Sequence, residues 1–140
     1  MKTWLIDTGP IVSYLDGSEP AHHSVAACLD SFGGWLYTTD AVIVEAMHFV
    51  NAARNGPSLL ADFLVASEMH IYPSCQPGQL RKAAELMDKY ADTPMDFADA
   101  TLVLLADRLG ILDIVTLDRR GFSVYRTSAG KPFRRILDLP

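Results

Sequence analysis

Short runs of apolar and β-branched residues alternate with longer segments whose apolar positions recur at helical spacing. This alternation constrains the fold more than any other feature of the chain. Thr3–Ile6 predicts a buried strand, and the turn Asp7-Thr8-Gly9-Pro10 that follows it begins a helix with proline in its first turn. We expect further strands at residues 35–37, 69–72 and 114–117, and one or two short strands between residues 122 and 137. Helices are expected at residues 20–32, 41–53, 57–66, 77–90 and 97–109.

Strands that alternate with helices are typical of an α/β fold with a parallel sheet. The crossover connections of such a sheet are right-handed and place helices on both of its faces. The sequence therefore predicts a three-layer sandwich around a mostly parallel central sheet. With 140 residues, the chain has the length of one ordinary domain, and we expect residues 1–140 to form a single domain. Open sheets of this kind bind ligands beyond the carboxyl ends of their strands.

The composition excludes several classes of protein. Apolar residues make up 49% of the chain and charged residues 21%, as in folded globular domains. The longest apolar runs have five residues, whereas a transmembrane helix needs about 20. Asp7 comes too early for a secretory signal, and Cys28 and Cys75 fit no disulfide or zinc framework. We therefore expect a cytoplasmic protein with reduced thiols and no membrane association.

Four acidic residues are predicted to meet at the carboxyl edge of this sheet. Asp7 directly follows the first strand, and Asp118 directly follows the strand expected at residues 114–117. Glu45 lies in an apolar helical stripe with Val42, Ala46, Phe49 and Ala53. Asp99 faces inward from the start of the helix at residues 97–109, in a row with Leu102, Val103 and Ala106. Thr8 and Thr116 adjoin the two strand ends and are expected to support the site.

Carboxylates gathered in this way repel one another unless a cation binds among them. No lysine or arginine lies within three residues of Asp7 or Glu45. Hard oxygen ligands suit Mg²⁺ or Mn²⁺, and such an ion can generate a hydroxide nucleophile and stabilise the charge that develops on a phosphate. The predicted chemistry is therefore metal-dependent hydrolysis at phosphorus, with Asp7, Glu45, Asp99 and Asp118 as ligands.

Each acidic residue also has a purely structural interpretation. Asp96 stands at the expected N-cap of the helix at residues 97–109, so Asp96 and Asp99 could form a pair like a capping box. Asp7 could form an Asx turn, and Asp118 could belong to the turn that ends its strand. Glu45 could be an ordinary surface residue. One shared metal site explains all these placements together.

The sequence around these acids resembles the PIN-domain ribonucleases, and most closely the VapC-like toxins of prokaryotic toxin–antitoxin pairs. Four blocks carry the resemblance and occur in the order and spacing of the family. They are Leu5-Ile6-Asp7-Thr8, Val42-Ile43-Val44-Glu45, Asp96-Phe97-Ala98-Asp99-Ala100-Thr101-Leu102 and Thr116-Leu117-Asp118-Arg119-Arg120-Gly121-Phe122.

The resemblance implies an endoribonuclease that depends on Mg²⁺ or Mn²⁺ and forms a homodimer. It also implies an antitoxin whose C-terminal segment blocks the site. The family's third acid directly precedes an alanine, so that role falls to Asp99, and Asp96 is an additional acid that could also be a ligand.

Other functions compete with this interpretation. Asp7-Thr8-Gly9 also matches the signature of aspartic proteases, which are almost entirely β-sheet proteins. A haloacid-dehalogenase-type phosphatase requires an aspartate where Gly9 stands, and a response-regulator receiver requires an aspartate after its third strand and a late lysine. Two alternatives lie closer: a catalytically silent PIN-like module that binds RNA or protein, and a housekeeping RNA-processing nuclease.

Charge is distributed unevenly along the chain, whose net charge is −5. Residues 119–140 carry six basic residues and one acid, whereas residues 1–118 carry six basic and sixteen acidic residues. A basic edge beside an acidic cation site can hold a phosphate backbone. Arg119 and Arg120 adjoin Asp118 and are the expected RNA contacts, although the same arginines could instead pair with acids of an antitoxin or a second subunit.

Overall fold

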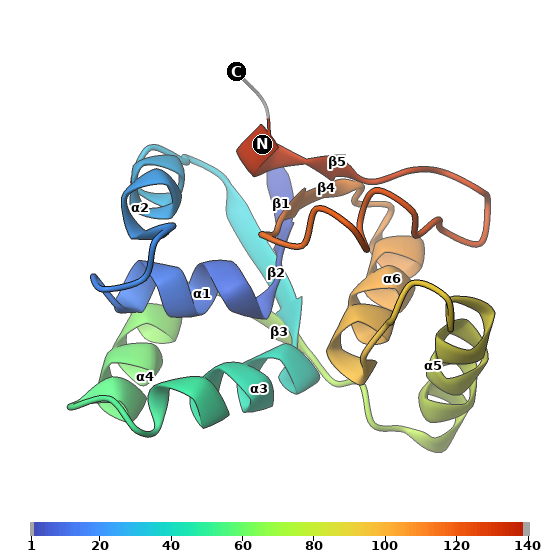
Figure 1. The fold of residues 1–140 in the computed structure, drawn as a ribbon, viewed down its shortest axis with the longest axis horizontal. Coiled ribbons are helices and arrows are strands. Elements are labelled where there is room, and N and C mark those ends of the chain that lie inside the picture. The colour runs from blue at the N-terminus through green and yellow to red at the C-terminus, as the bar shows by residue number, and fades with distance from the viewer. Residues whose placement is uncertain (1, 139–140) are drawn as a thin grey trace.

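The computed structural model describes residues 2–138 and contains five strands and six α-helices within that range (Figure 1). The strands are β1 (Thr3–Ile6), β2 (Trp35–Thr39), β3 (His70–Tyr72), β4 (Asp113–Val115) and β5 (Arg134–Arg135). The helices are α1 (Thr8–Leu15), α2 (His22–Asp30), α3 (Asp40–Val50), α4 (Gly56–Ala66), α5 (Pro77–Lys89) and α6 (Phe97–Leu109), and a 3₁₀ turn, η1, spans Ile136–Asp138.

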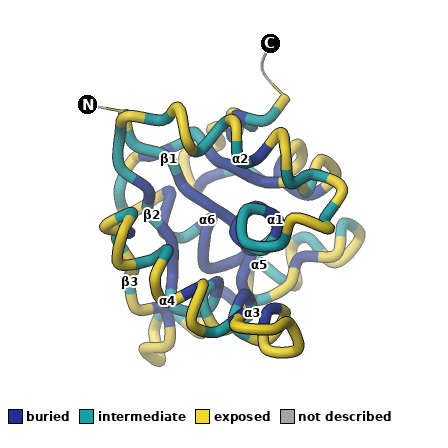
Figure 2. The backbone as a smooth tube through the Cα atoms, turned by 90° about the vertical axis from the view of Figure 1, so that its left-hand side faces the viewer, coloured by how far each residue is buried: buried dark blue, intermediate teal, exposed yellow. Residues whose placement is uncertain are grey.

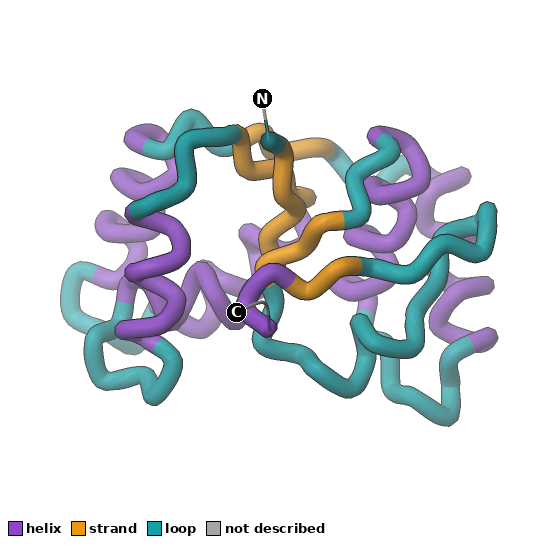
Figure 3. The backbone as a smooth tube through the Cα atoms, turned by 90° about the horizontal axis from the view of Figure 1, so that it is seen from above, coloured by secondary structure: helices purple, strands orange, loops and turns teal. Residues whose placement is uncertain are grey.

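The strands form one sheet in the order β3-β2-β1-β4-β5, and every neighbouring pair is parallel. Helices α1 to α4 pack together on one side of this sheet, and α5 packs against α6 on the other (Figures 1 and 3). The predicted three-layer sandwich with a parallel central sheet is therefore confirmed. Because β1 lies at the centre, its carboxyl end is surrounded by the ends of β2 and β4.

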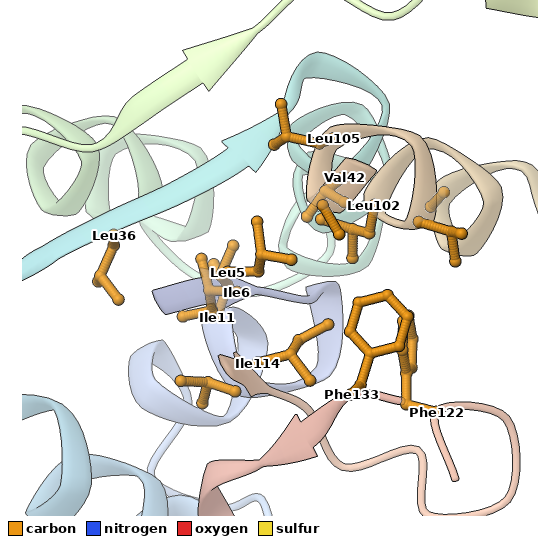
Figure 4. Packing of buried hydrophobic residues seen from close by; sticks show 14 of the residues in the cluster. Leu5, Ile6, Ile11, Leu36, Val42, Leu102, Leu105, Ile114, Phe122 and Phe133 are labelled. Atoms are coloured by element: carbon orange, nitrogen blue, oxygen red, sulfur yellow. The ribbon is translucent and has the colours of Figure 1, made fainter. Parts of the chain in front are cut away.

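The core extends through both helical layers and the central strands. Leu5 and Ile6 of β1 and Ile114 of β4 have no exposed surface, and Figure 4 shows them close to Ile11 of α1. Burying one such aliphatic side chain contributes about 1.5–3 kcal/mol. Helix α6 is buried along most of its length, from Ala98 to Ala106, which explains why it appears dark beside the strands in Figure 2. The central strands and α6 thus form a rigid support for whatever lies at their ends.

Local hydrogen bonds fix where the helices begin. The Thr39 hydroxyl accepts a hydrogen bond from the Val42 amide and caps α3. Helix α6 begins at Phe97 and ends at Gly110, which adopts the left-handed conformation that glycine tolerates (φ 69°). Both helix starts lie at the same edge of the sheet as the carboxyl ends of β1 and β4.

Three local predictions were wrong. Strand β4 ends at Val115 rather than at residue 117, so Asp118 follows it after two intervening residues. The reason is that the Asp118 amide donates to the Thr116 hydroxyl (3.0 Å), which turns the chain out of the sheet. Helix α3 ends at Val50, and both Phe49 and Ala53 are exposed, so the apolar stripe of α3 consists of Val42, Ala46 and Val50.

The expectation of one or two short strands between residues 122 and 137 was confirmed. One two-residue strand, β5, joins the sheet, and a single antiparallel bridge connects Arg126 with Pro132. Among residues 2–138, no helix is both long enough and apolar enough to span a bilayer.

Candidate functional site

Asp7 lies at the junction of β1 and α1, where its carboxylate caps the helix. Its Oδ1 accepts a hydrogen bond from the Thr8 amide (2.8 Å), and its Oδ2 accepts one from the Thr116 hydroxyl (2.9 Å). The Asp7 amide also donates to the carbonyl of Val115 (3.0 Å). Only 8% of Asp7 is exposed. These contacts hold one buried carboxylate at the carboxyl end of the central strand.

Asp118 is connected to Asp7 through Thr116, whose hydroxyl donates to Asp7 and accepts from the Asp118 amide. The Asp118 Oδ1 accepts a hydrogen bond from the Gly121 amide (2.8 Å). A side chain on Gly121 would collide with Asp118 and with the Tyr125 hydroxyl, so glycine is required there by a close approach. The turn after β4 therefore fixes the second carboxylate.

Asp96 and Asp99 form a reciprocal capping box at the start of α6. The Asp99 amide donates to Asp96 Oδ1 (2.8 Å), and the Asp96 amide donates to Asp99 Oδ2 (3.2 Å). Asp99 is 9% exposed and lies at the inner side of the helix, whereas Asp96 is exposed. The structural interpretation of the pair is thus confirmed, and it brings both carboxylates to the cleft that Asp7 also lines.

Glu45 reaches the same cleft from the second turn of α3 and is half-buried. Thr8 lies nearby, and its hydroxyl oxygen is buried with no hydrogen-bond partner within residues 2–138. A buried hydroxyl without a partner is uncommon, because it forgoes its hydration. The Thr8 hydroxyl also lies near enough to the Glu45 carboxylate to lower the pKa of that group, so it supplies an oxygen on the wall of the cleft.

These side chains line a cleft of about 390 Å³ that contains six carboxylates and no lysine or arginine. Four of the six are the predicted acids Asp7, Glu45, Asp99 and Asp118, and the fifth is Asp96. Sequence reasoning missed the sixth, Glu19, which comes from the loop between α1 and α2. A loop residue has no periodicity, so no sequence signal could have placed Glu19 there.

The crowding of these acids perturbs their protonation. Burial raises the pKa of Asp7 to about 6, and the charges of Asp96 and Glu45 add to this effect. Burial also raises the pKa of Asp99 to about 8, together with the charges of Asp7 and Asp96. Burial, followed by the charge of Asp96, raises the pKa of Glu45. The cleft is thus strongly unfavourable for negative charge in the protein alone.

The donors of this cleft fit a divalent cation in chemical type. They are carboxylate and hydroxyl oxygens, which Mg²⁺ and Mn²⁺ prefer, and the unpartnered Thr8 hydroxyl adds an oxygen among them. Their arrangement does not yet match a coordination shell. Within residues 2–138, no three acidic, histidine or cysteine side chains are close enough together to hold one ion. Asp96, Asp99 and Asp118 each accept a backbone hydrogen bond through one carboxylate oxygen, which leaves the second oxygen of each carboxylate for a cation.

The predicted RNA contacts lie outside the cleft. Arg119 and Arg120 are exposed, and neither lines it. The Arg119 guanidinium lies 3.7 Å from Asp138. The structure therefore brings Thr8, Thr116 and the acids together but leaves the two arginines on the surface beyond Asp118.

The architecture excludes the aspartic-protease interpretation of Asp7-Thr8-Gly9. That class is almost entirely β-sheet, whereas this chain has six α-helices and a parallel sheet within the described residues. Asp7 is the N-cap of α1 rather than part of a β-rich active-site loop.

Comparison with known proteins agrees with this architecture. The model of the PIN domain matches residues 4–127. Ribonuclease VapC26 of Mycobacterium tuberculosis is 35% identical over 136 residues, which cover 94% of this chain and 98% of that protein. Two crystal structures share the fold. Mycobacterium tuberculosis VapC20, described as a sarcin-ricin loop cleaving toxin, has a TM-score of 0.75 at 15% identity, covering 84% of this chain and 91% of its own. FitAcB from Neisseria gonorrhoeae has a TM-score of 0.60 at 22% identity, covering 85% and 89%. The chain belongs to the PIN-domain family.

Proposed function

We propose that this protein is an endoribonuclease that depends on Mg²⁺ or Mn²⁺ and acts as the toxin of a toxin–antitoxin pair. The observation that carries the proposal is the cleft in which Asp7, Glu45, Asp99 and Asp118 meet without any basic residue. Similarity to a ribonuclease along almost the whole chain supports RNA as the substrate.

The four acids have distinct parts in this proposal. Asp7 is held rigidly by Thr8 and Thr116 and would be the fixed ligand of the cation. Asp99, Asp118 and Glu45 would complete the site, and Asp96 would be an additional ligand or remain the cap of α6. A bound divalent cation supplies an acidified water and neutralises charge on the scissile phosphate. Thr116 positions Asp7 and Asp118 relative to each other, because its hydroxyl bonds to both.

The raised pKa values of Asp7 and Asp99 support cation binding at this place. Each carboxylate must lose its proton to act as a ligand, and a cation stabilises the ionised forms that burial and repulsion disfavour. Removing the cation should therefore leave protons on the acidic cluster at neutral pH. Proton release on addition of Mg²⁺ to metal-free protein is the expected signature.

A catalytically silent PIN-like module is the main alternative. Such a module has no need of several buried acids that repel one another, whereas this chain keeps all four acids in one cleft. A housekeeping RNA-processing nuclease would share the same cleft and differ only in its partners. We propose a homodimer, a cognate antitoxin and a cytoplasmic location as parts of the toxin assignment.

The decisive experiment measures cleavage of fluorescently labelled RNA by purified protein. Activity should appear with Mg²⁺ or Mn²⁺, disappear with EDTA and return when the metal is restored. Asp99→Asn should lower the rate by orders of magnitude, while Asp62→Asn, which changes an exposed acid of α4, should leave it unchanged. Activity that persists in EDTA, or in Asp99→Asn, would refute the proposed site.

The toxin assignment needs a separate test. Induced expression should arrest growth, and co-expression of the product of a short neighbouring gene should restore it. That product is expected to have a DNA-binding fold and an amphipathic tail. Cleavage in vitro without growth arrest would favour the housekeeping nuclease instead.

A further inference from the structure

A second and larger hollow lies on the other side of the sheet from α1 to α4. It has a volume of about 720 Å³ and is formed by α5, the second half of α6 and the segment at residues 126–128. Figure 1 shows α5 and α6 side by side, with the chain between β4 and β5 passing near them. We call this hollow the α5–α6 groove. The charged residues of its lining are Lys82, Glu85, Lys89, Asp107, Arg108 and Arg126.

The α5–α6 groove contains four basic residues and only two acidic ones. The four cations are Lys82, Lys89, Arg108 and Arg126, and none of them lies within 4.0 Å of a carboxylate in the described part of the chain. Asp107 keeps its negative charge and accepts hydrogen bonds from the amide and the hydroxyl of Ser128. With four basic and two acidic residues, the lining carries a net charge of +2 in a protein whose net charge is −5.

Contacts within the described residues engage these cations only through neutral groups: Lys89 lies 5.3 Å from the centroid of the Tyr90 ring and Arg108 lies 5.3 Å from that of Tyr72. Lys82, Lys89 and Arg108 are exposed, and their ammonium and guanidinium groups make no hydrogen bond to the described residues. Leu86 and Leu104 supply apolar surface along which the lysine stems can lie, so the charged ends remain available at the rim. Arg126 donates through one nitrogen to three backbone carbonyls, those of Ser123, Val124 and Tyr125, which fixes its position.

The α5–α6 groove and the acidic cleft differ in charge, and this difference indicates a role for the groove. A cleft lined by six carboxylates and no cation repels a polyanion, so attraction of RNA must come from elsewhere on the surface. The two sites are connected by one short segment. Asp118 lies at its beginning in the cleft, and Arg126 lies in the groove, directly after Tyr125, whose pKa is raised by burial and by the nearby charges of Asp99 and Asp118.

We propose that the α5–α6 groove binds the phosphate backbone of the RNA substrate to one side of the acidic cleft. This inference rests on the proposed nuclease function. Lys82 and Lys89 would bind phosphates as mobile point charges, and Arg108 and Arg126 would bind them through planar guanidinium groups. Binding of this kind releases counterions and depends strongly on salt, but it carries no sequence specificity.

The test compares two double variants that remove the same charge. Lys82→Ala/Lys89→Ala removes two cations from the groove, and Lys2→Ala/Arg81→Ala removes two exposed cations outside it. Affinity for a fluorescently labelled oligoribonucleotide of mixed sequence is measured by anisotropy in EDTA, across a salt series. Cleavage of the same RNA by wild-type protein in Mg²⁺ is measured in parallel.

We expect the groove variant to bind RNA roughly ten- to twentyfold more weakly at about 0.1 M salt, with a salt slope lower by about one unit or more. The control variant should bind like the wild type, and circular dichroism should show both variants folded. An equal loss in both variants, or no loss in either, would overturn the proposal. The same is true if the groove variant loses affinity only for an acidic peptide such as polyglutamate, because the groove would then be a protein-docking site.

The two proposals fail separately. If the wild-type protein cleaves RNA and Lys82→Ala/Lys89→Ala binds RNA as well as the wild type does, the RNA-binding role of the groove is disproved and the nuclease function stands. If that variant binds RNA more weakly but the wild-type protein cleaves no RNA, the RNA-binding role of the groove is supported and the proposed nuclease function is disproved.

Discussion

Replacing Asp7 by asparagine should stabilise the metal-free protein at neutral pH, although it removes the central acid of the cleft. Burial and neighbouring charges raise the pKa of Asp7 from 3.8 to about 6. Each pKa unit corresponds to about 1.4 kcal/mol, so keeping Asp7 ionised in the folded state costs about 3 kcal/mol at neutral pH. Asparagine carries no charge and avoids this cost.

The hydrogen bonds of Asp7 reduce the expected gain. Asparagine can still accept from the Thr8 amide through its carbonyl oxygen, but its amide group cannot accept from the Thr116 hydroxyl. Loss of that bond costs about 1–2 kcal/mol. We therefore expect Asp7→Asn to raise the free energy of unfolding by about 1–2 kcal/mol, and the melting temperature by about 3–7 °C for a chain of this size.

The pH dependence of the stability change distinguishes a charge effect at Asp7 from a purely structural role of its hydrogen bonds. An acid whose pKa is higher in the folded than in the unfolded state favours folding most below pH 3.8, and this contribution disappears as the pH rises through about 6. The stability difference between Asp7→Asn and wild type should therefore grow between about pH 4 and pH 7. Urea unfolding followed by circular dichroism in EDTA measures it, with Asp62→Asn as the control at an exposed position.

Metal provides the second half of the same experiment. Mg²⁺ should stabilise the wild type by binding only to its folded state, and should stabilise Asp7→Asn much less. A variant that is less stable than wild type at every pH would refute the reasoning, because Asp7 would then act as a structural hydrogen-bonding residue. A stability difference that is constant across the pH range would refute it as well.

Three further variants test single contacts. Gly121→Ala should push the Asp118 carboxylate out of place, so the concentration of Mg²⁺ needed for cleavage should rise; unchanged metal dependence would contradict the close approach. Asp96→Ala removes the cap of α6 and should lower the free energy of unfolding by about 1 kcal/mol at acidic pH. At neutral pH the loss should be smaller, because the variant no longer has the Asp96 charge that repels Asp7 and Asp99. Urea unfolding at both pH values measures the difference, and a larger loss at neutral pH would contradict this reasoning. Arg119→Ala/Arg120→Ala should weaken RNA binding and flatten its salt dependence while assembly survives; unchanged RNA binding with loss of assembly, read by anisotropy and light scattering, would make these arginines interface residues.

The layers of the fold were predictable because they depend on local patterns. The alternation of strands and helices indicated a parallel sheet, and the N-cap at Asp96 and the stop at Gly110 fixed α6 at both ends. The end of β4 was not predictable, because Leu117 continues the apolar run while the hydroxyl of Thr116 turns the chain. The apolar stripe of α3 was extended too far, since Phe49 looks like a core residue in sequence but is exposed in the fold.

The site was predictable where an acid adjoined a regular element. Asp7, Glu45, Asp99 and Asp118 all line the cleft, because each lies at or near the carboxyl edge of the sheet. The position of Glu19 depends on how its loop folds back, which no periodic pattern encodes. The α5–α6 groove was not predictable either, because Arg126 joins Lys82 and Arg108 only through tertiary structure.

The hydrogen bond between Thr116 and Asp7 joins residues that are 109 positions apart. A ribosome makes the N-terminal end first, so Asp7 emerges long before β4, the strand that must pair with β1, exists. Until that pairing, β1 lacks one of its two neighbours and Asp118 has no fixed place beside Asp7. Under the proposed function, the order of synthesis therefore keeps the nascent chain inactive while it is still attached to the ribosome, which is itself rich in RNA.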